Sequence, residues 1–232
     1  MKVILSNDFF YSPTILDSIF KQIEYEIYPD KIYREIFNKE LLTEITFKQD
    51  TKKYRNYIFS DFWHIPKNNQ LSLCGNSLRS LVSENAGGNS SISEMMSIEY
   101  FFRVFSAKEV LLEMEVQYWI DYKMVDFVCT IPFQGRDFRV GVSVTRAMGY
   151  PSPENFTYER GLKLLQKKLY GLIVSRRGVI KKHSFYKSIL HVWCQTARIA
   201  YLLQKAYESF DIQDYGLNIK GIVILQLTVC SE

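Results

Sequence analysis

Two acidic residues, Glu115 and Asp126, have the side-chain type and the sequence spacing to bring two carboxylates together on a β-sheet. Each lies in an apolar segment typical of a strand, and residues 119–122 between them form a connection short enough for a hairpin. A symmetrical turn about Ile120 and Asp121 places Glu115 directly across from Asp126, on the same face of the sheet. The pair predicts a site at which a positive group relieves the repulsion between the carboxylates.

A third side chain extends this pair into a row across three strands. If the next hairpin turns about its Gln-Gly dipeptide, Ser143 lies opposite Asp126 and shares its face with Glu115. The positive group is then either a divalent ion, Mg²⁺ or Mn²⁺, because oxygen-rich sites suit hard cations, or one of two lysines in the following helix, Lys163 and Lys167. A register slip of one residue would instead turn Glu115 away, and an exposed row would simply be solvated.

Positive charge is concentrated in one part of the chain. The net charge is +4, but residues 155–190 hold nine basic residues against the single acidic Glu159, a local charge of +8 that leaves the remainder net acidic. Such segregation indicates a polyanionic partner such as nucleic acid, although a solvated helix face or an acidic protein partner would also fit. The candidate nucleic-acid-binding residues are Arg146, at the end of a strand, and Arg160, Lys168, Arg176, Arg177, Lys181 and Lys182 within the basic segment.

Hydrophobic periodicity predicts the elements that position these residues. In chain order we expect a helix over residues 91–105, strands over 109–118, 123–132 and 137–146, a helix over 155–174, a strand over 188–194, a helix over 197–210 and a strand over 221–230. The first three strands form an antiparallel meander. Because a helix then crosses over, the fourth strand should run parallel to a neighbour. The fold class is therefore α/β, an α+β arrangement with a mixed sheet.

The chain divides at one stretch of small and polar residues. Residues 84–91 cannot bury apolar surface, so they predict a flexible loop between a mixed α/β region over residues 1–83 and a compact domain over residues 92–232. The first region is expected to hold two helices, the first opened by Ser12 and Pro13, and a hairpin. This region is an N-terminal helical and hairpin extension of the main domain.

The expected order of helix, three strands, helix and strand resembles the PD-(D/E)XK nuclease-like superfamily, whose core is α-β-β-β-α-β. That family often has an acidic residue on the first helix, matched here by Glu94 or Glu99, and an Asp on the second strand, matched by Asp126. The third strand departs from the family's Glu-x-Lys pattern, with Ser143 and Thr145 at those positions. The resemblance implies a restriction-endonuclease-like core with a degenerate third-strand motif.

The resemblance covers residues 91–193 and implies metal-dependent hydrolysis of phosphodiester bonds. Asp126 and Glu99 would be metal ligands, and Glu115 would substitute for the missing Glu of the third strand. One of the two lysines in the following helix would have to replace the missing Lys. The ion, Mg²⁺ or Mn²⁺, would activate water for attack on phosphorus.

We therefore expect a nucleic-acid-binding protein with a nuclease-like fold, in which cleavage of DNA or RNA by a divalent-metal-dependent phosphodiesterase is an open question. The alternatives are an inactive nuclease-like module and a protein-interaction adaptor in a nucleic-acid-processing complex. No apolar run approaches the roughly 20 residues of a membrane span, and the four cysteines are too widely spaced for a zinc pattern. We accordingly expect a soluble, intracellular protein, nuclear or cytoplasmic, with reduced thiols and no membrane partner.

Overall fold

The computed structural model describes residues 58–63, 73–83, 91–120, 122–133, 135–185, 187–210 and 223–230. Its elements are β1 (Ile58–Trp63), α3 (Gly75–Val82), α4 (Ser91–Phe105), β2 (Lys108–Leu112), η1 (Glu113–Glu115), β3 (Phe127–Phe133), β4 (Arg136–Ala147), η2 (Pro153–Asn155), α5 (Tyr158–Gly178), η3 (Lys181–His183), β5 (Lys187–Cys194), α6 (Ala197–Ser209) and β6 (Val223–Cys230), where η marks short 3₁₀ turns. The two helices expected in the N-terminal region lie outside the described residues, as do residues 84–90 of the expected loop.

One mixed sheet runs through the described part of the molecule, in the order β1-β6-β5-β4-β3-β2. β1, β6, β5 and β4 are mutually parallel, whereas β3 is antiparallel to β4 and β2 is antiparallel to β3. The expected meander followed by a parallel fourth strand is therefore confirmed. The chain is a mixed α/β protein.

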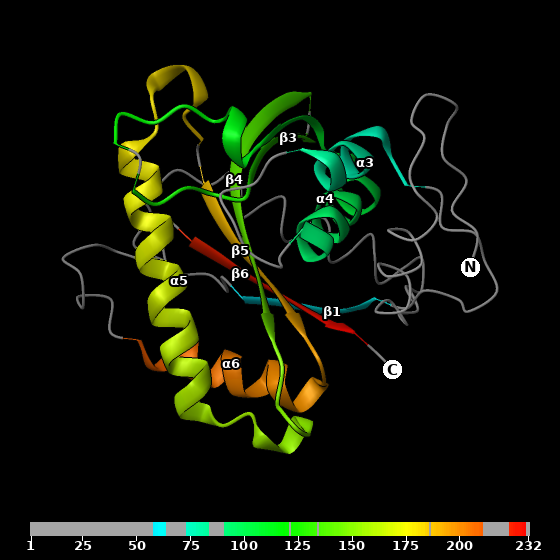
Figure 1. Ribbon diagram of the computed structural model, residues 1–232, viewed down its shortest axis with the longest axis vertical. Coiled ribbons are helices and arrows are strands. Elements are labelled where there is room, and N and C mark those ends of the chain that lie inside the picture. Colours follow the sequence, from blue (N-terminus) through cyan, green and yellow to red (C-terminus); the bar gives the residue numbers. More distant parts are fainter. Residues whose placement is uncertain are drawn as a thin grey trace.

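Helices cover both faces of this sheet (Figure 1). α3 and α4 lie on one face, over a core that contains Phe127, Val142 and Ile189. α5 and α6 lie on the other face, over a core that contains Leu190 and Leu225. Successive residues of a strand point to opposite faces, which is why neighbours such as Ile189 and Leu190 belong to different cores. Every residue of β5 is buried, as expected for a central parallel strand covered on both sides.

α5 is the crossover helix between β4 and β5. It begins after Thr157, whose hydroxyl accepts the backbone N–H of Arg160 at 3.3 Å and so satisfies one of the free donors at the helix start. Leu165, Leu169 and Leu172 recur at helical spacing and are buried against the sheet, as the sequence pattern predicts. The helix continues to Gly178, four residues beyond the expected end.

The two predicted hairpins differ in outcome. The β3–β4 hairpin has the expected register, with Phe127 opposite Val142, and Gly135 occupies its turn with a positive φ of 72°. The β2–β3 pair does not, because β2 stops at Leu112 and its last residue lies opposite Phe127. The segment after Leu112 forms the 3₁₀ turn η1 where a continuing strand was expected.

Two elements of the expected N-terminal region belong to the same structure as the main domain. β1 pairs along its whole length with β6, so it forms one edge of the sheet. α3 packs beside α4, and Leu73 at its start lies in the core beneath them. In the part of the chain that the structure describes, no helix is long and apolar enough to cross a membrane.

Candidate functional site

Asp126 lies immediately before β3, on the face of the sheet that α5 covers. Its Oδ2 atom accepts hydrogen bonds from the Ser143 hydroxyl at 2.8 Å and from the backbone N–H of Val144 at 2.6 Å. Ser143 lies between Val142 and Val144, which both belong to the α4-side core, so its own side chain faces α5. The prediction that Asp126 faces Ser143 across the hairpin is confirmed.

The unequal lengths of two strands explain these bonds. β4 has 12 residues and β3 has seven, and β3 pairs only with residues 136–142 of β4. Backbone groups beyond that point on this edge of β4 need other partners. The Asp126 carboxylate accepts from the N–H of Val144, and the Lys168 ammonium donates to the carbonyl oxygen of Val144 at 2.8 Å. Two charged side chains therefore satisfy both polar backbone groups of one residue where the ladder ends.

Lys168 is the lysine that the structure places near Asp126. Lys163 and Lys167 were the lysines expected near Asp126, but both are exposed on α5. Lys168 was assigned to nucleic-acid contact, yet it lies three residues after Leu165 and therefore close to the buried stripe of the helix. The spacing from the leucines was the signal that would have identified it.

Tyr118 lies beside Asp126, in the loop that precedes β3. Its hydroxyl oxygen accepts the backbone N–H of Val125 at 3.0 Å. Burial raises the pKa of this phenol to about 12, and the negative charges of Glu113 and Asp126 act in the same direction. Tyr118 is therefore a neutral hydroxyl at physiological pH.

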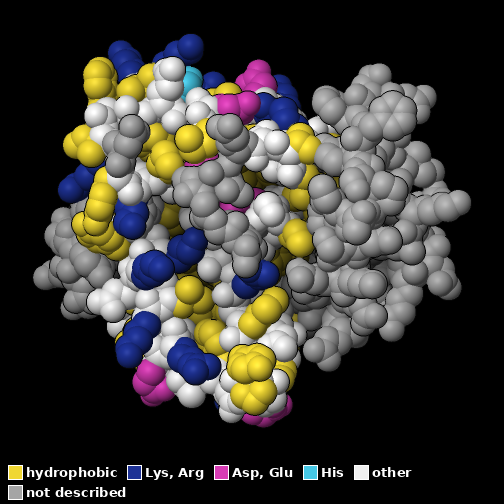
Figure 2. Space-filling view, in the orientation of Figure 1, with side chains coloured by type: hydrophobic (Ala, Val, Ile, Leu, Met, Phe, Trp, Pro, Cys, Tyr) yellow, Lys and Arg dark blue, Asp and Glu magenta, His cyan; other side chains and the backbone are white. Residues whose placement is uncertain are grey.

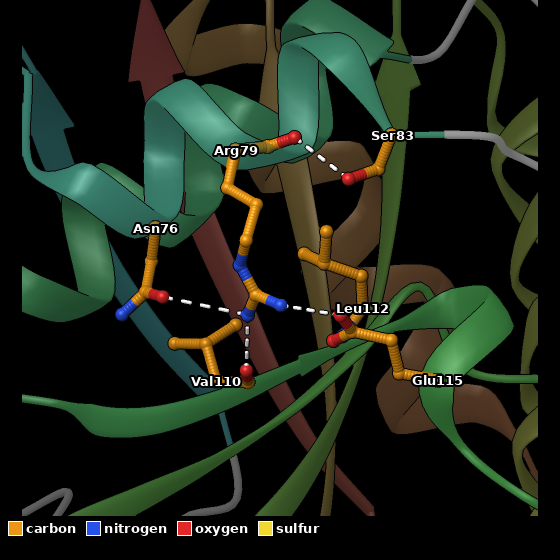
Figure 3. Close-up of polar contacts among 6 residues, drawn as sticks. All are labelled: Asn76, Arg79, Ser83, Val110, Leu112 and Glu115. Carbon is orange, nitrogen blue, oxygen red and sulfur yellow. Dashed lines mark hydrogen bonds and ion pairs between the residues drawn. The ribbon is translucent and has the colours of Figure 1, made fainter. Parts of the chain in front are cut away.

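Glu115 does not pair with Asp126, and this expectation is wrong. Because β2 ends at Leu112, Glu115 lies in η1 and not in the ladder. Its Oε2 accepts the Leu112 N–H at 2.8 Å, and its Oε1 pairs with Arg79 of α3 (Figure 3). Arg79 also donates to the carbonyl of Val110 at 2.5 Å. Glu115 thus links α3 to the end of β2 through its ion pair with Arg79 and its hydrogen bond from Leu112.

Glu99 is also engaged away from Asp126. It is fully buried on α4, on the opposite face of the sheet. One carboxylate oxygen accepts the Cys74 N–H at 2.7 Å and the Ser77 hydroxyl at 2.8 Å, and the other accepts Nε of Arg103 at 2.6 Å. The carboxylate joins α3 to α4. The sheet separates it from Asp126, so the two do not form a shared site.

The expected metal ligands are therefore dispersed. Asp126 is the one member of the expected set at the β3–β4 edge, whereas Glu99 and Glu115 bind partners in α3, α4 and β2. Within the described ranges, no group of three or more His, Cys, Asp or Glu side chains could hold a metal ion. Among these residues, the arrangement offers one carboxylate, one hydroxyl and one ammonium around a single backbone residue.

The basic residues separate into exposed and engaged groups. Figure 2 shows Lys and Arg side chains spaced along the side of the molecule that α5 forms. Arg146 is exposed at the end of β4, Arg176 is half-buried and Lys187 is buried. The exposed cations of α5 and η3 are Arg160, Lys163, Lys167, Arg177, Lys181 and Lys182, which we call the α5 basic face.

Comparison with known proteins gives one relative and no family. A Dictyostelium discoideum protein described as "AAC-rich mRNA clone AAC4 protein" is 34% identical over 135 residues, which is 56% of this chain and 19% of that protein. The chain therefore spans about a fifth of that relative's length. No protein-family model and no solved structure matches the chain.

Proposed function

We propose that the chain is a nucleic-acid-binding module with a nuclease-like fold, in which the α5 basic face contacts phosphates. The order α4-β2-β3-β4-α5-β5 supports the scaffold, because β4 is antiparallel to β3 and parallel to β5, as in an α-β-β-β-α-β core. Asp126, immediately before β3, lies close to the second-strand position at which the nuclease-like family has an Asp. The third strand lacks that family's Glu and Lys, which favours binding over hydrolysis.

The α5 basic face is the observation that carries this proposal. α5 has 21 residues and is therefore about 30 Å long, and η3 extends its cations further. Within the described residues, none of the six side chains is neutralised by an ion pair. A row of unneutralised cations of this length suits a linear polyanion, which gains affinity by releasing its condensed counterions.

Charge reversal on this face is the direct test. The variant Lys163→Glu/Lys167→Glu should bind DNA or RNA at least about tenfold more weakly at low salt, and the slope of log affinity against log salt should fall by about one for each phosphate that the variant no longer neutralises. The matched control is Lys108→Glu/Lys205→Glu, which changes the net charge equally at cations paired with Asp137 and Glu208. Anisotropy titrations of labelled oligonucleotides at several salt concentrations measure both effects.

Equal losses in the two variants would show a response to net charge alone and would contradict a specific role for α5. Failure of the wild-type chain to bind any DNA or RNA, single- or double-stranded, would remove the proposal. In that case the adaptor function, in which the same basic face binds an acidic protein, becomes the better account.

Metal-dependent cleavage of phosphodiester bonds is a second candidate, favoured by the convergence of Asp126 and Lys168 on Val144. A carboxylate is a ligand that Mg²⁺ and Mn²⁺ accept, and an ammonium stabilises negative charge on a phosphate. Mg²⁺ is often held by one or two carboxylates, with water and substrate phosphates completing its shell. Asp126 meets that minimum as the single carboxylate ligand among the described residues, with Lys168 beside it to contact phosphate.

The variant Asp126→Asn separates this candidate from simple binding. If the chain cleaves labelled DNA or RNA with Mn²⁺, the variant should lose roughly 10²-fold or more in rate while it retains affinity for nucleic acid. Equal cleavage by both proteins would contradict the role of Asp126. Absence of cleavage by the wild type, with no heat on titration with Mn²⁺, would leave the binding module as the function.

A further inference from the structure

The loop between η1 and β3 presents three large side chains to solvent. Trp119 is 77% exposed, Ile120 is 70% exposed and Tyr122 is 59% exposed. Large apolar side chains in a cluster are unusual on a surface unless they contact a partner. Lys123 follows directly, and its ammonium lies 5.0 Å from the centre of the Tyr122 ring. The exposed group thus combines flat aromatic surfaces with a cation.

The backbone at the start of this loop, residues 117–119, is hydrogen-bonded although the side chain of Trp119 is exposed. Residues 117–119 pair with residues 178–180, at the C-terminal end of α5, in a short antiparallel bridge. The backbone N–H of Trp119 donates to the carbonyl oxygen of Gly178 at 2.7 Å. The backbone N–H of Ile180 donates to the carbonyl oxygen of Gln117 at 3.1 Å. Trp119 is therefore presented from a hydrogen-bonded backbone, which lowers the entropic cost of binding.

The same bridge brings basic residues to the loop. Arg177 and Lys181 lie on either side of the paired residues 178–180, and Lys182 is fixed nearby by a bond from Arg139 to its carbonyl at 2.7 Å. We call Trp119, Ile120, Tyr122, Lys123, Arg177, Lys181 and Lys182 the aromatic-basic surface. Asp121, in the same loop, lies outside the described residues. In Figure 2, hydrophobic and basic side chains lie side by side along the upper left edge, where Figure 1 places this loop against the end of α5.

We infer that the aromatic-basic surface binds single-stranded nucleic acid, with bases stacked on Trp119 and Tyr122 and phosphates held by Arg177, Lys181 and Lys182. This inference rests on the proposed function and specifies its substrate class. Stacking requires unpaired bases with free faces, which a duplex does not offer, whereas phosphate contacts serve both forms. The α5 basic face would then bind either form, and the loop would distinguish them.

The arrangement favours a nucleic-acid strand over a membrane surface, which also attracts aromatic and basic side chains. Three cations of the surface, Arg177, Lys181 and Lys182, also belong to the α5 basic face, whose other members lie along a helix of about 30 Å. Successive phosphates of one extended strand can follow both regions, because each cation spaced along the helix can neutralise one phosphate. The cations shared by the two regions therefore favour a nucleic-acid strand as the ligand of this surface.

The test compares matched truncations in the full chain. Trp119→Ala/Tyr122→Ala should weaken binding of a single-stranded oligonucleotide by roughly 30-fold or more, because each stacking interaction contributes about fivefold or more and the two factors multiply. The same variant should change binding of the matching duplex less than about twofold. The control is Phe102→Ala/Tyr201→Ala, which removes two exposed rings elsewhere, including one that also lies beside a lysine. That control should bind both forms like the wild type.

A second readout reports stacking directly. Single-stranded oligonucleotide should quench the fluorescence of the exposed Trp119, whereas Trp193 is buried and should not respond. Trp119→Phe keeps a ring for stacking, so it should retain most of the affinity while it loses the quenching. The substituted side chains are all exposed in the folded protein, so the variants should fold normally.

Other outcomes would overturn the inference. If the truncated variant binds single strands like the wild type, the loop has no role, although the proposed function stands. If the wild type binds neither form, the proposed function fails and the inference with it. If phosphatidylserine vesicles, but not single strands, bind in a manner that depends on Trp119 and Tyr122, the surface is a membrane contact.

Discussion

The two faces of the sheet are built on different principles. On the α4 side, polar groups are sealed inside: Glu99 is fully buried between helices, and His191 and Thr228 hydrogen-bond at 2.9 Å beneath them. On the α5 side, the core is a leucine stripe, and polar groups lie at its edge, around Asp126, or outside it, on the α5 basic face. Buried polar groups with protein partners chiefly fix the fold, whereas charges that remain exposed are available to a ligand.

The contrast suggests which acidic residues serve structure and which could serve function. Glu99 has both of its oxygens engaged by protein donors. Asp126 uses Oδ2 for two bonds and is only half-buried, so it retains capacity for a further contact. Substitution of each residue tests this division, because a structural residue should contribute more to the free energy of unfolding.

The largest loss of stability should follow from lowering the pH, because His191 is buried on the α4 side of the sheet. Burial lowers the pKa of His191 to about 3, against about 6.5 in the unfolded chain. Below pH 6.5 the unfolded chain takes up a proton that the folded chain excludes, so this contribution to stability is present above pH 6.5 and is lost as pH falls toward 3. Between pH 7 and pH 4 the loss should be roughly 3 kcal/mol.

Urea unfolding of the wild type and of His191→Gln across this range measures the effect. Glutamine does not titrate, so the variant should lose less stability than the wild type as the pH falls, whatever its stability at pH 7. Parallel curves for the two proteins would show that His191 accepts a proton in the folded state.

A somewhat smaller effect should follow from neutralising Glu99. Glu99→Gln removes the charge that Arg103, Ser77 and the Cys74 N–H share, and the amide offers one acceptor where the carboxylate offered two. We expect a loss of about 2–3 kcal/mol in the free energy of unfolding. The control is Glu208→Gln on α6, an exposed partner of Lys205, which should cost less than about 1 kcal/mol. Similar costs for both would indicate that the Glu99 cluster is solvated.

Asp126→Asn should cost about 1–2 kcal/mol, because the carboxylate accepts two hydrogen bonds at the end of the β3–β4 ladder. Lys168→Met, which keeps the length of the side chain but removes its bond to Val144, should cost about 1 kcal/mol. A carboxylate repelled by Glu115 would predict the opposite sign for Asp126→Asn. Stabilisation by that variant in metal-free buffer would therefore favour the repelled pair over the hydrogen-bonded site.

Much of the fold could be predicted because its signals are local. The leucine stripe of α5, the apolar run of β5 and the Gln-Gly turn of the β3–β4 hairpin each determine a nearby structure. The turn also determined the register, so Asp126 was correctly placed opposite Ser143. The crossover rule then gave the parallel direction of β5.

The first hairpin could not be predicted in this way because its connection is not a tight turn. Residues after Leu112 fold into η1 and then pair with the end of α5, more than 50 residues away in the chain. Arg79, which holds Glu115, comes from another distant helix. Alternation of apolar residues carries no information about such contacts, so a strand was extended through a segment that bends. The exposed loop that results holds Trp119 and Tyr122, which no motif identified.

The smallest expected effect on stability is that of Glu115, which lies in η1 and away from Asp126. Glu115 and Arg79 are each roughly two-fifths exposed, so their ion pair should contribute less than about 1 kcal/mol. Glu115 and Asp126 have separate hydrogen-bond partners, and residues 116–125 separate them in the chain. The costs of Glu115→Gln and Asp126→Asn should therefore add, with a coupling energy within about 0.5 kcal/mol of zero. A double-mutant cycle by urea unfolding measures this coupling energy. The same cycle with Lys168→Met in place of Glu115→Gln should give a clearly larger coupling energy, because Asp126 and Lys168 both hydrogen-bond to Val144. Strong coupling of Glu115 to Asp126 would restore the carboxylate pair at the site, and with it the stronger case for a bound metal ion.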